Sequence, residues 1–412
     1  MSYSAGTHVQ VKAAAQVVLR IVPLTSTKAV VFTKLSNAAL NAIYARVVDV
    51  SGTSVTLGAE KTIATDTEYD VGFIDSTHIL FYSSRAYASS YTGYALVLTI
   101  SGTDITIGPQ GADIRSLIGL RLAMLSSTTA IALGYNNSPV ARVLTISGTT
   151  VTAGATKVFG NGNNDYSYRV AALDSSTAVV AYRRASTLVG NAIVLKVSGT
   201  DITVGAAVQY TAANHVQDNW VTKIDSTHAC ILWRDASDSN KGKCCVATVN
   251  GLGLTLGAVG EFESGGMTDP TGDVSGAVDA DTLRIAYNEA DNDGHMKNGQ
   301  VSGTTVSWQA GETVHSGGTD TVAVAKMDGA GLGLFMYTDT ADADVKVFAF
   351  IDSEFASTNW TANPADSASL SDSRAALAGK APSDVVGLSD FFSSSVRNPV
   401  AIRLGLGLGE GP

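Results

Sequence analysis

A short polar turn recurs along this chain at nearly constant spacing, and this repeat constrains the fold more than any other feature. Successive turn glycines lie 46–52 residues apart. The copies are Ser51-Gly52-Thr53, Ser101-Gly102-Thr103, Ser147-Gly148-Thr149, Ser198-Gly199-Thr200, Asn250-Gly251 and Ser302-Gly303-Thr304. An alternating apolar run precedes each copy and a shorter one follows it, so the repeat predicts a series of small sheets, as in a propeller or a solenoid.

A second signature raises the expected number of units from six to seven. An apolar residue, a small polar turn and an apolar run ending in an aromatic residue recur through the chain. The aromatic residues are Phe32, Tyr82, Tyr135, Tyr182, Trp233, Tyr287 and Tyr337. Because a bulky side chain in every unit suits packing between neighbouring sheets, we expect these residues to fill the interblade space rather than to line a channel.

Each unit divides into four expected strands, which we name a, b, c and d. In the second unit they are 70–74, 78–82, 94–100 and 104–108. Since no helical pattern intervenes, successive strands are expected to be antiparallel. We therefore predict an all-β fold, a seven-bladed β-propeller of four-stranded antiparallel blades; a solenoid is the alternative.

The two ends of the repeat region predict how the ring closes. The opening run Gly6-Thr7-His8-Val9-Gln10-Val11 is similar to the turn and strand d of later units, whereas the seventh unit has no clear strand d. We predict that residues 6–12 form the outer strand of blade seven and pair with residues 344–351. The propeller then occupies residues 1–353, and residues 354–412 form a short irregular tail for attachment or oligomerisation.

Composition restricts the function classes. With 37 acidic and 27 basic residues, the net charge of −10 argues against a nucleic-acid-binding face. No uninterrupted apolar stretch reaches the length of a membrane span, and residues 1–12 do not resemble a secretory signal. The cysteines, Cys230, Cys244 and Cys245, are expected to be small buried residues; a Cys230–Cys245 bridge or metal ligation is the alternative.

The b–c and d–a connections vary between units, and we expect recognition residues on the face that they share. Aromatic residues with polar neighbours occur there and could stack on sugars, while loop packing and ordinary surface are the competing explanation. The candidate ligand-binding residues are Arg85, Tyr87, Tyr91, Asn164, Asp165, Tyr166, Tyr168, Asp218 and Trp220.

The chain carries little that indicates catalysis or a cofactor. Residues 289–294 resemble the first half of an EF-hand loop, but the twelfth position is Gln300 and no helices are expected around it. We therefore expect a solvated acidic loop there, with calcium binding as the alternative. The histidines lack ligand spacing, and no nucleophile elbow or phosphate-binding loop is present, so we predict no catalytic residues, no metal and no cofactor.

Part of the C-terminal segment is similar in sequence to a known kind of linker. The phrase Ala-Leu-Ala-Gly-Lys-Ala-Pro at 376–382, followed by Asp-Val-Val-Gly-Leu at 384–388, resembles linkers of bacteriophage tail fibres and related virion appendages. The Ser-Gly-Thr repeat is similar to propeller repeats of uncharacterised phage and environmental proteins. The His-x-His step of such linkers is missing here, which puts trimerisation through this segment in doubt.

This resemblance implies a virion structural protein: a tail fibre, spike or capsid appendage that attaches to a host surface or glycan. Its partners would be other virion proteins, contacted through residues 354–412, and a second copy of the chain. A soluble propeller lectin or adhesin is the alternative, followed by a glycan-degrading enzyme.

Overall fold

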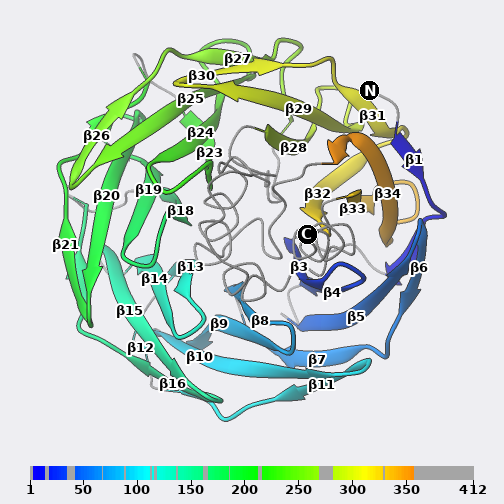
Figure 1. Ribbon diagram of the computed structural model, residues 1–412, viewed down its shortest axis with the longest axis horizontal. Helices are drawn as coiled ribbons and strands as arrows, with labels where there is room; N and C mark the ends of the chain where they lie inside the picture. Colours follow the sequence, from blue (N-terminus) through cyan, green and yellow to red (C-terminus); the bar gives the residue numbers. More distant parts are fainter. Residues whose placement is uncertain are drawn as a thin grey trace, which may run out of the picture. The chain divides into compact units, whose positions relative to one another are not determined.

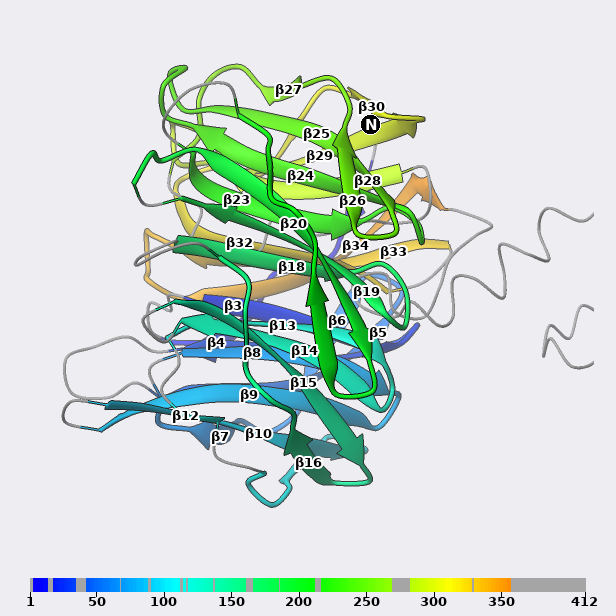
Figure 2. The ribbon, with the colours of Figure 1, turned by 90° about the vertical axis from the view of Figure 1, so that its left-hand side faces the viewer.

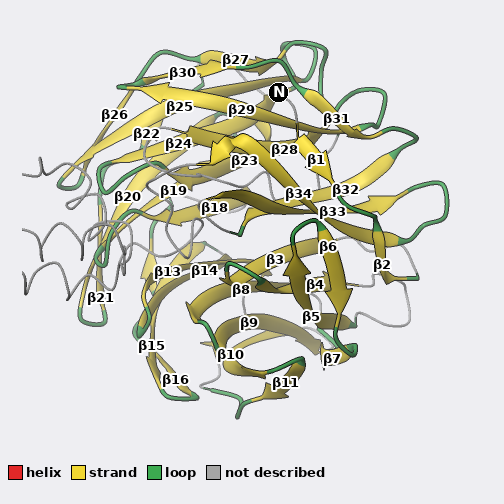
Figure 3. Cartoon of the chain, turned by 45° about the vertical axis from the view of Figure 1, so that its right-hand side comes forward, coloured by secondary structure: helices red, strands yellow, loops and turns green. Residues whose placement is uncertain are grey.

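The computed structural model describes residues 3–13, 18–34, 42–66, 68–87, 90–111, 114–115, 118–135, 138–160, 166–184, 186–211, 216–268, 282–327 and 330–356. These residues form seven separate sheets arranged as the blades of a ring (Figure 1). The described residues contain strands and loops without a helix (Figure 3), so none of them forms a helix that could cross a membrane. The predicted all-β, seven-bladed propeller is confirmed, while the tail beyond Ala356 lies outside the described residues.

The inner strands surround the ring axis, and each blade continues outward through antiparallel neighbours (Figures 1 and 2). The inner strands, a, are β3 Val18–Thr25, β8 Glu68–Asp75, β13 Ile118–Ser126, β18 Tyr166–Ala172, β23 Val216–Lys223 and β32 Thr319–Lys326. The second strands, b, are β4 Lys28–Lys34, β9 His78–Tyr87, β14 Thr129–Tyr135, β19 Thr177–Arg183, β24 His228–Asp235, β28 Thr282–Asn288 and β33 Ala330–Asp339. The third strands, c, are β5 Ile43–Ser51, β10 Ser90–Ser101, β15 Pro139–Ser147, β20 Gly190–Ser198, β25 Lys241–Asn250, β29 Gly294–Ser302 and β34 Val345–Ala356. The expected strand a of blade six falls in 269–281, outside the described residues.

The outermost strand of each blade is divided in two, where the sequence predicted one continuous strand d. Both halves pair with the same third strand. The pairs of halves are β6 Ser54–Leu57 with β7 Lys61–Ala64, β11 Asp104–Ile107 with β12 Ile114–Arg115, β16 Thr150–Ala153 with β17 Lys157–Val158, β21 Asp201–Val204 with β22 Val208–Gln209, β26 Gly253–Leu256 with β27 Gly260–Glu263, and β30 Thr305–Trp308 with β31 Glu312–His315.

A glycine follows the first half of the outer strand in every blade except blade six, where Gln309 takes this place and donates to Asn298 O at 2.9 Å. The Gly58 amide donates to Val47 O at 2.8 Å, and Gly257 donates to Val246 O at the same distance. A Cβ atom on Gly257 would lie only 2.2 Å from Thr304 O, in the Ser-Gly-Thr turn of the next blade. The repeated glycine therefore lets each turn dock against the preceding blade, because any side chain there would collide with backbone.

The ring closes through the N-terminus, as predicted. Strands β1 Tyr3–Ala5 and β2 Val9–Lys12 both pair with β34, in registers that include Ala5 with Phe350 and Val9 with Val347. The role of Gly6 differs from the prediction. Its amide donates to Ala349 O at 2.8 Å, and its Cβ position faces Thr53 O, so Gly6 corresponds to Gly58 and Gly257 rather than to a turn glycine.

The core lies between blades. The strand-b aromatics Phe32, Tyr82, Tyr182, Trp233, Tyr287 and Tyr337 are each at most 1% exposed. Tyr82 packs in one cluster with residues of blade three, such as Leu120 and Leu144, which confirms the predicted interblade role. Tyr135 is half-buried and packs at the edge of the next cluster.

The cysteines are buried free thiols, as expected. Cys245 pairs directly opposite Ile231, one residue along from Cys230, so Cys230 and Cys245 face opposite sides of their sheet. They belong to different core clusters. The register therefore excludes the alternative Cys230–Cys245 bridge.

Candidate functional site

The b–c turns and the connections into each next blade emerge on one face of the ring, which we call the variable face. The opposite face carries the Ser-Gly-Thr turns, whose glycines adopt φ values of 58–62° in every copy. The b–c turns differ from blade to blade: β14 and β15 are joined by 136–138, β19 and β20 by 184–189, and β24 and β25 by 236–240. A uniform scaffold thus presents unlike turns on a single face.

Two of the predicted ligand-binding aromatics lie inside the protein. Tyr168 is 3% exposed and packs edge-on against Phe159, with ring centroids 5.8 Å apart. Trp220 is 2% exposed and packs in a cluster with Leu232 and Phe262. Both residues belong to inner strands rather than loops, since β18 and β23 begin earlier than expected. Their ring faces are therefore occupied by core contacts.

The remaining predicted residues divide by position. The Asp218 carboxylate forms an ion pair with Arg234, at 3.0 Å from Nη2, and this pair ties strand a of blade five to strand b. Arg85, Tyr87 and Tyr91 lie on the long β9–β10 hairpin, which replaces most of the loop expected at 83–93. Tyr166 begins β18. Asn164 and Asp165 fall outside the described residues. Among the described residues, Tyr168 and Trp220 lie in different core clusters, so the nine predicted residues do not form one site.

Two acidic turns on the variable face are each closed by a lysine. In blade five, Lys243 Nζ lies 3.0 Å from Asp235 Oδ2 and 2.7 Å from Asp238 Oδ2. In blade seven, Lys346 Nζ lies 2.8 Å from Asp339 Oδ2 and 2.6 Å from Asp342 Oδ2. Hydrogen bonds from Lys346 hold the pKa of Asp342 below its ordinary value.

Blade six has a third acidic turn, which contains residues 289–294, where a solvated acidic loop was predicted and calcium binding was the alternative. Glu289, Asp291 and His295 place one potential metal-ligand atom each within 4.8 Å of one another. His295 Nδ1 lies 3.4 Å from Glu289 Oε1. Burial and then the charge of Glu263 raise the pKa of Glu289 to about 6.

Glu263, at the end of the outer strand of blade five, lies near this turn and interacts electrostatically with Glu289. Its carboxylate accepts a hydrogen bond from Tyr287 Oη at 2.9 Å and from the Gly265 amide at 2.7 Å. Lys297 Nζ lies 3.4 Å from the same carboxylate and also donates to Phe262 O. The Lys297 ammonium is thus directed toward Glu263.

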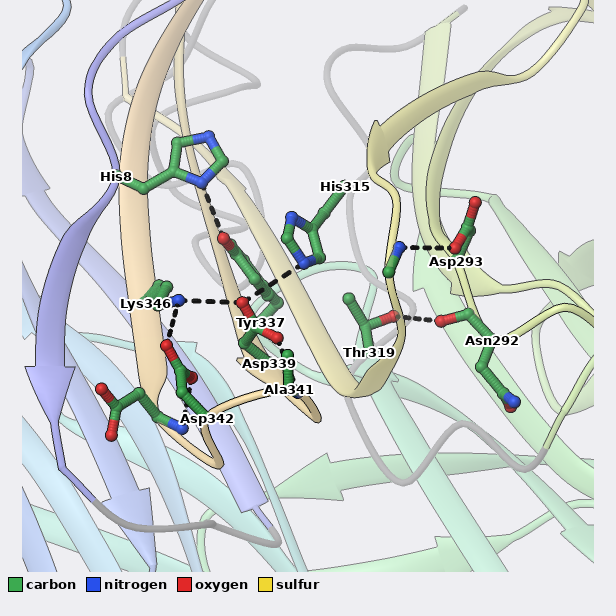
Figure 4. A network of polar contacts seen from close by, with 12 residues as sticks. His8, Asn292, Asp293, His315, Thr319, Tyr337, Asp339, Ala341, Asp342 and Lys346 are labelled. Atoms are coloured by element: carbon green, nitrogen blue, oxygen red, sulfur yellow. Dashed lines mark hydrogen bonds and ion pairs between the residues drawn. The ribbon is translucent and has the colours of Figure 1, made fainter.

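A network beside blade seven joins the two chain segments that close the ring (Figure 4). His8 Nδ1 and Tyr337 Oη share a hydrogen bond of 2.6 Å, and the His8 ring stacks on Phe348 at 4.5 Å. His315 Nε2 lies 3.4 Å from Asp339 Oδ2. These contacts connect the N-terminal segment with β31, β33 and β34, and they point to a structural role for the network.

Sequence reasoning missed Lys243, Lys346, Glu263 and His295 as members of the variable face. A signal was present, because an acid follows the strand-b aromatic by two positions in three successive blades: Asp235, Glu289 and Asp339. Which residue lies beside each acid depends on the pairing of strands b and c, which places one strand-c residue opposite each aromatic.

Comparison with known proteins adds little to this geometry. No protein-family model and no curated protein matches the chain. Among solved structures, a functionally unknown protein from Desulfotomaculum acetoxidans has a TM-score of 0.47 at 15% identity, covering 70% of this chain and 84% of that chain. The NanB sialidase from Streptococcus pneumoniae, in complex with 2-[(3-chlorobenzyl)ammonio]ethanesulfonate, has a TM-score of 0.45 at 10% identity, covering 85% and 70% respectively. At such scores neither structure assigns a site or an activity to this chain.

Proposed function

We propose that this chain is a bacteriophage virion protein that presents the variable face of its propeller to the host surface. The observation that carries the proposal is the contrast between the two faces: one is built from nearly identical turns, and the other presents different turns in each blade. A rigid scaffold with unlike loops on one side is the usual arrangement of a recognition surface. The resemblance of residues 376–388 to fibre linkers supports the virion assignment.

A glycan is the ligand class that this face suits best. Among the described residues it presents carboxylates and ammonium groups, as in the Asp235–Lys243 and Asp339–Lys346 pairs. Such groups donate and accept hydrogen bonds with sugar hydroxyls. We propose binding without catalysis, because these carboxylates are already engaged by lysines and by backbone amides such as Ala341 N.

We propose that residues 354–412 join the propeller to other virion proteins or to further copies of the chain. Removing 357–412 tests this idea, since every described strand is retained. We expect the shortened protein to remain folded and to keep its glycan binding but to lose incorporation into particles. If incorporation and oligomeric state are unchanged, the anchoring role is refuted.

A glycan array probed with the full chain separates this proposal from its rivals. Selective retention of one glycan class without cleavage supports an attachment protein. Release of sugar products would favour a glycan-degrading enzyme. A chain that binds glycans but is absent from purified particles would favour a soluble lectin.

A further inference from the structure

The acidic turns of blades five, six and seven share one plan but differ at one position. The strand-c residue paired with the strand-b aromatic is Lys243 opposite Trp233 in blade five and Lys346 opposite Tyr337 in blade seven. In blade six the residue opposite Tyr287 is His295. The position that carries an ammonium in two blades therefore carries an imidazole in the third.

This exchange removes a fixed positive charge from the turn. Each lysine contacts two carboxylates of its own turn at 3.0 Å or less. His295 approaches Glu289 only to 3.4 Å, and an imidazole carries no permanent positive charge. Lys297, the nearest lysine along β29, is directed to Glu263 and Phe262 O. Glu289 and Asp291 thus share their turn with an imidazole nitrogen instead of a fixed ammonium group.

The His295 side chain has the properties of a ligand without its ion. The residue is 7% exposed, and Nε2 is buried without a hydrogen bond. Within the described residues the ring makes no hydrogen bond at either nitrogen, and Nδ1 faces the Glu289 carboxylate. Nδ1 thus has a carboxylate within reach but no hydrogen bond, so an ion held between the two groups would give this nitrogen a partner.

The separation of one donor pair is that expected for two ligands of a small cation. Zinc binds histidine nitrogen and carboxylate oxygen at about 2.0–2.2 Å in tetrahedral geometry, so two of its ligands lie roughly 3.3–3.5 Å apart. The 3.4 Å between His295 Nδ1 and Glu289 Oε1 matches that separation. Asp291 is held in place because its Oδ1 accepts the Asp293 amide at 2.9 Å. Its exposed position leaves room for water in the remaining coordination site.

We propose that Glu289, Asp291 and His295 bind one divalent transition-metal ion, with Zn²⁺ as the preferred occupant, in the place that lysine fills in blades five and seven. Calcium is a poor fit, since it takes six to eight oxygen ligands and imidazole is a nitrogen donor. The ion would fix the b–c turn of blade six on the variable face, as the Lys243 and Lys346 ammonium groups fix its neighbours.

Titration calorimetry on the full chain, stripped with EDTA and then titrated with ZnCl₂ or CaCl₂, tests the site. We expect one equivalent of zinc to bind and raise the melting temperature, with no measurable response to calcium. Glu289→Gln should weaken zinc binding by more than about tenfold, and substituted Co²⁺ should give the intense visible absorption of a tetrahedral nitrogen–oxygen site. Binding well below one equivalent, or a calcium response equal to that of zinc, would overturn the proposal.

The His295→Lys variant gives the most direct test, because it places a lysine where blades five and seven have one. We expect it to fold, to be more stable than the EDTA-stripped native chain and to lose the zinc response. The matched control is His315→Gln, which removes a histidine from the network beside blade seven and should leave zinc affinity unchanged. If zinc affinity survives His295→Lys or is lost with His315→Gln, the ion binds elsewhere and the assignment is wrong.

Discussion

Replacing Val11 by alanine tests whether the N-terminus completes blade seven. Val11 is 3% exposed and packs in a cluster with Leu334 and Val347 of blade seven and Leu19 of blade one. At about 0.8 kcal/mol for each buried methylene-sized group, loss of two methyl groups costs about 1.6 kcal/mol, and the remaining cavity brings the total to about 2 kcal/mol. The exposed Thr7→Ala substitution should change the free energy of unfolding by less than about 0.5 kcal/mol.

Denaturant unfolding gives the free-energy change, and hydrogen exchange locates it. Because β1 and β2 pair only with β34, we expect Val11→Ala to accelerate exchange in β34 before it affects a distant third strand such as β20. A cost as small as that of Thr7→Ala, or faster exchange spread evenly over all blades, would refute the closing role of residues 3–12.

Three further predictions concern packing and charge. Gly257→Ala should lower the free energy of unfolding by about 1–3 kcal/mol, because its Cβ would lie 2.2 Å from Thr304 O; Gly253→Ala, with its nearest atom at 3.2 Å, is the control in the same denaturant assay. Trp220→Ala should lower the free energy of unfolding by about 3–5 kcal/mol in that assay, because the indole is buried. A near-neutral result would indicate that Trp220 lies at the surface. In EDTA, Glu289→Gln should be more stable than the native chain above pH 6, since the raised pKa of Glu289 makes its ionisation destabilising, and this advantage should disappear as pH falls below about 4. Melting temperatures measured across this range check the sign, and an advantage largest at low pH would contradict it.

The repeat made the architecture predictable from sequence. Gly52 and its equivalents mark turns that need positive φ, and the strand-b aromatics mark the interblade core, so blade number followed from counting. Gly6 was predicted to be a turn glycine, but it is the glycine that divides the outer strand. Its role depends on contact with the next blade, because a side chain there would collide with Thr53 O, which lies 47 positions away in sequence. Local patterns do not encode such contacts.

The candidate site was less predictable for a related reason. Tyr168 and Trp220 follow polar loop residues in sequence, but the strands begin earlier than the pattern indicates, and pairing then directs both rings into the core. Conversely, the acidic segment 289–294 becomes a candidate metal site only together with His295, which the pairing of strands b and c places beside it. Strand register, rather than composition, decides which polar residues meet.

Selective blocking of the two faces shows which of them binds a ligand. The native cysteines are buried, so a single introduced cysteine can carry a bulky polyethylene glycol. Ala341→Cys places it on the variable face and Ser101→Cys on the opposite face, both at exposed positions. On a glycan array, we predict that the label at 341 abolishes binding while the label at 101 leaves it intact. Equal binding by both labelled proteins, or loss only with the label at 101, would contradict recognition through the variable face.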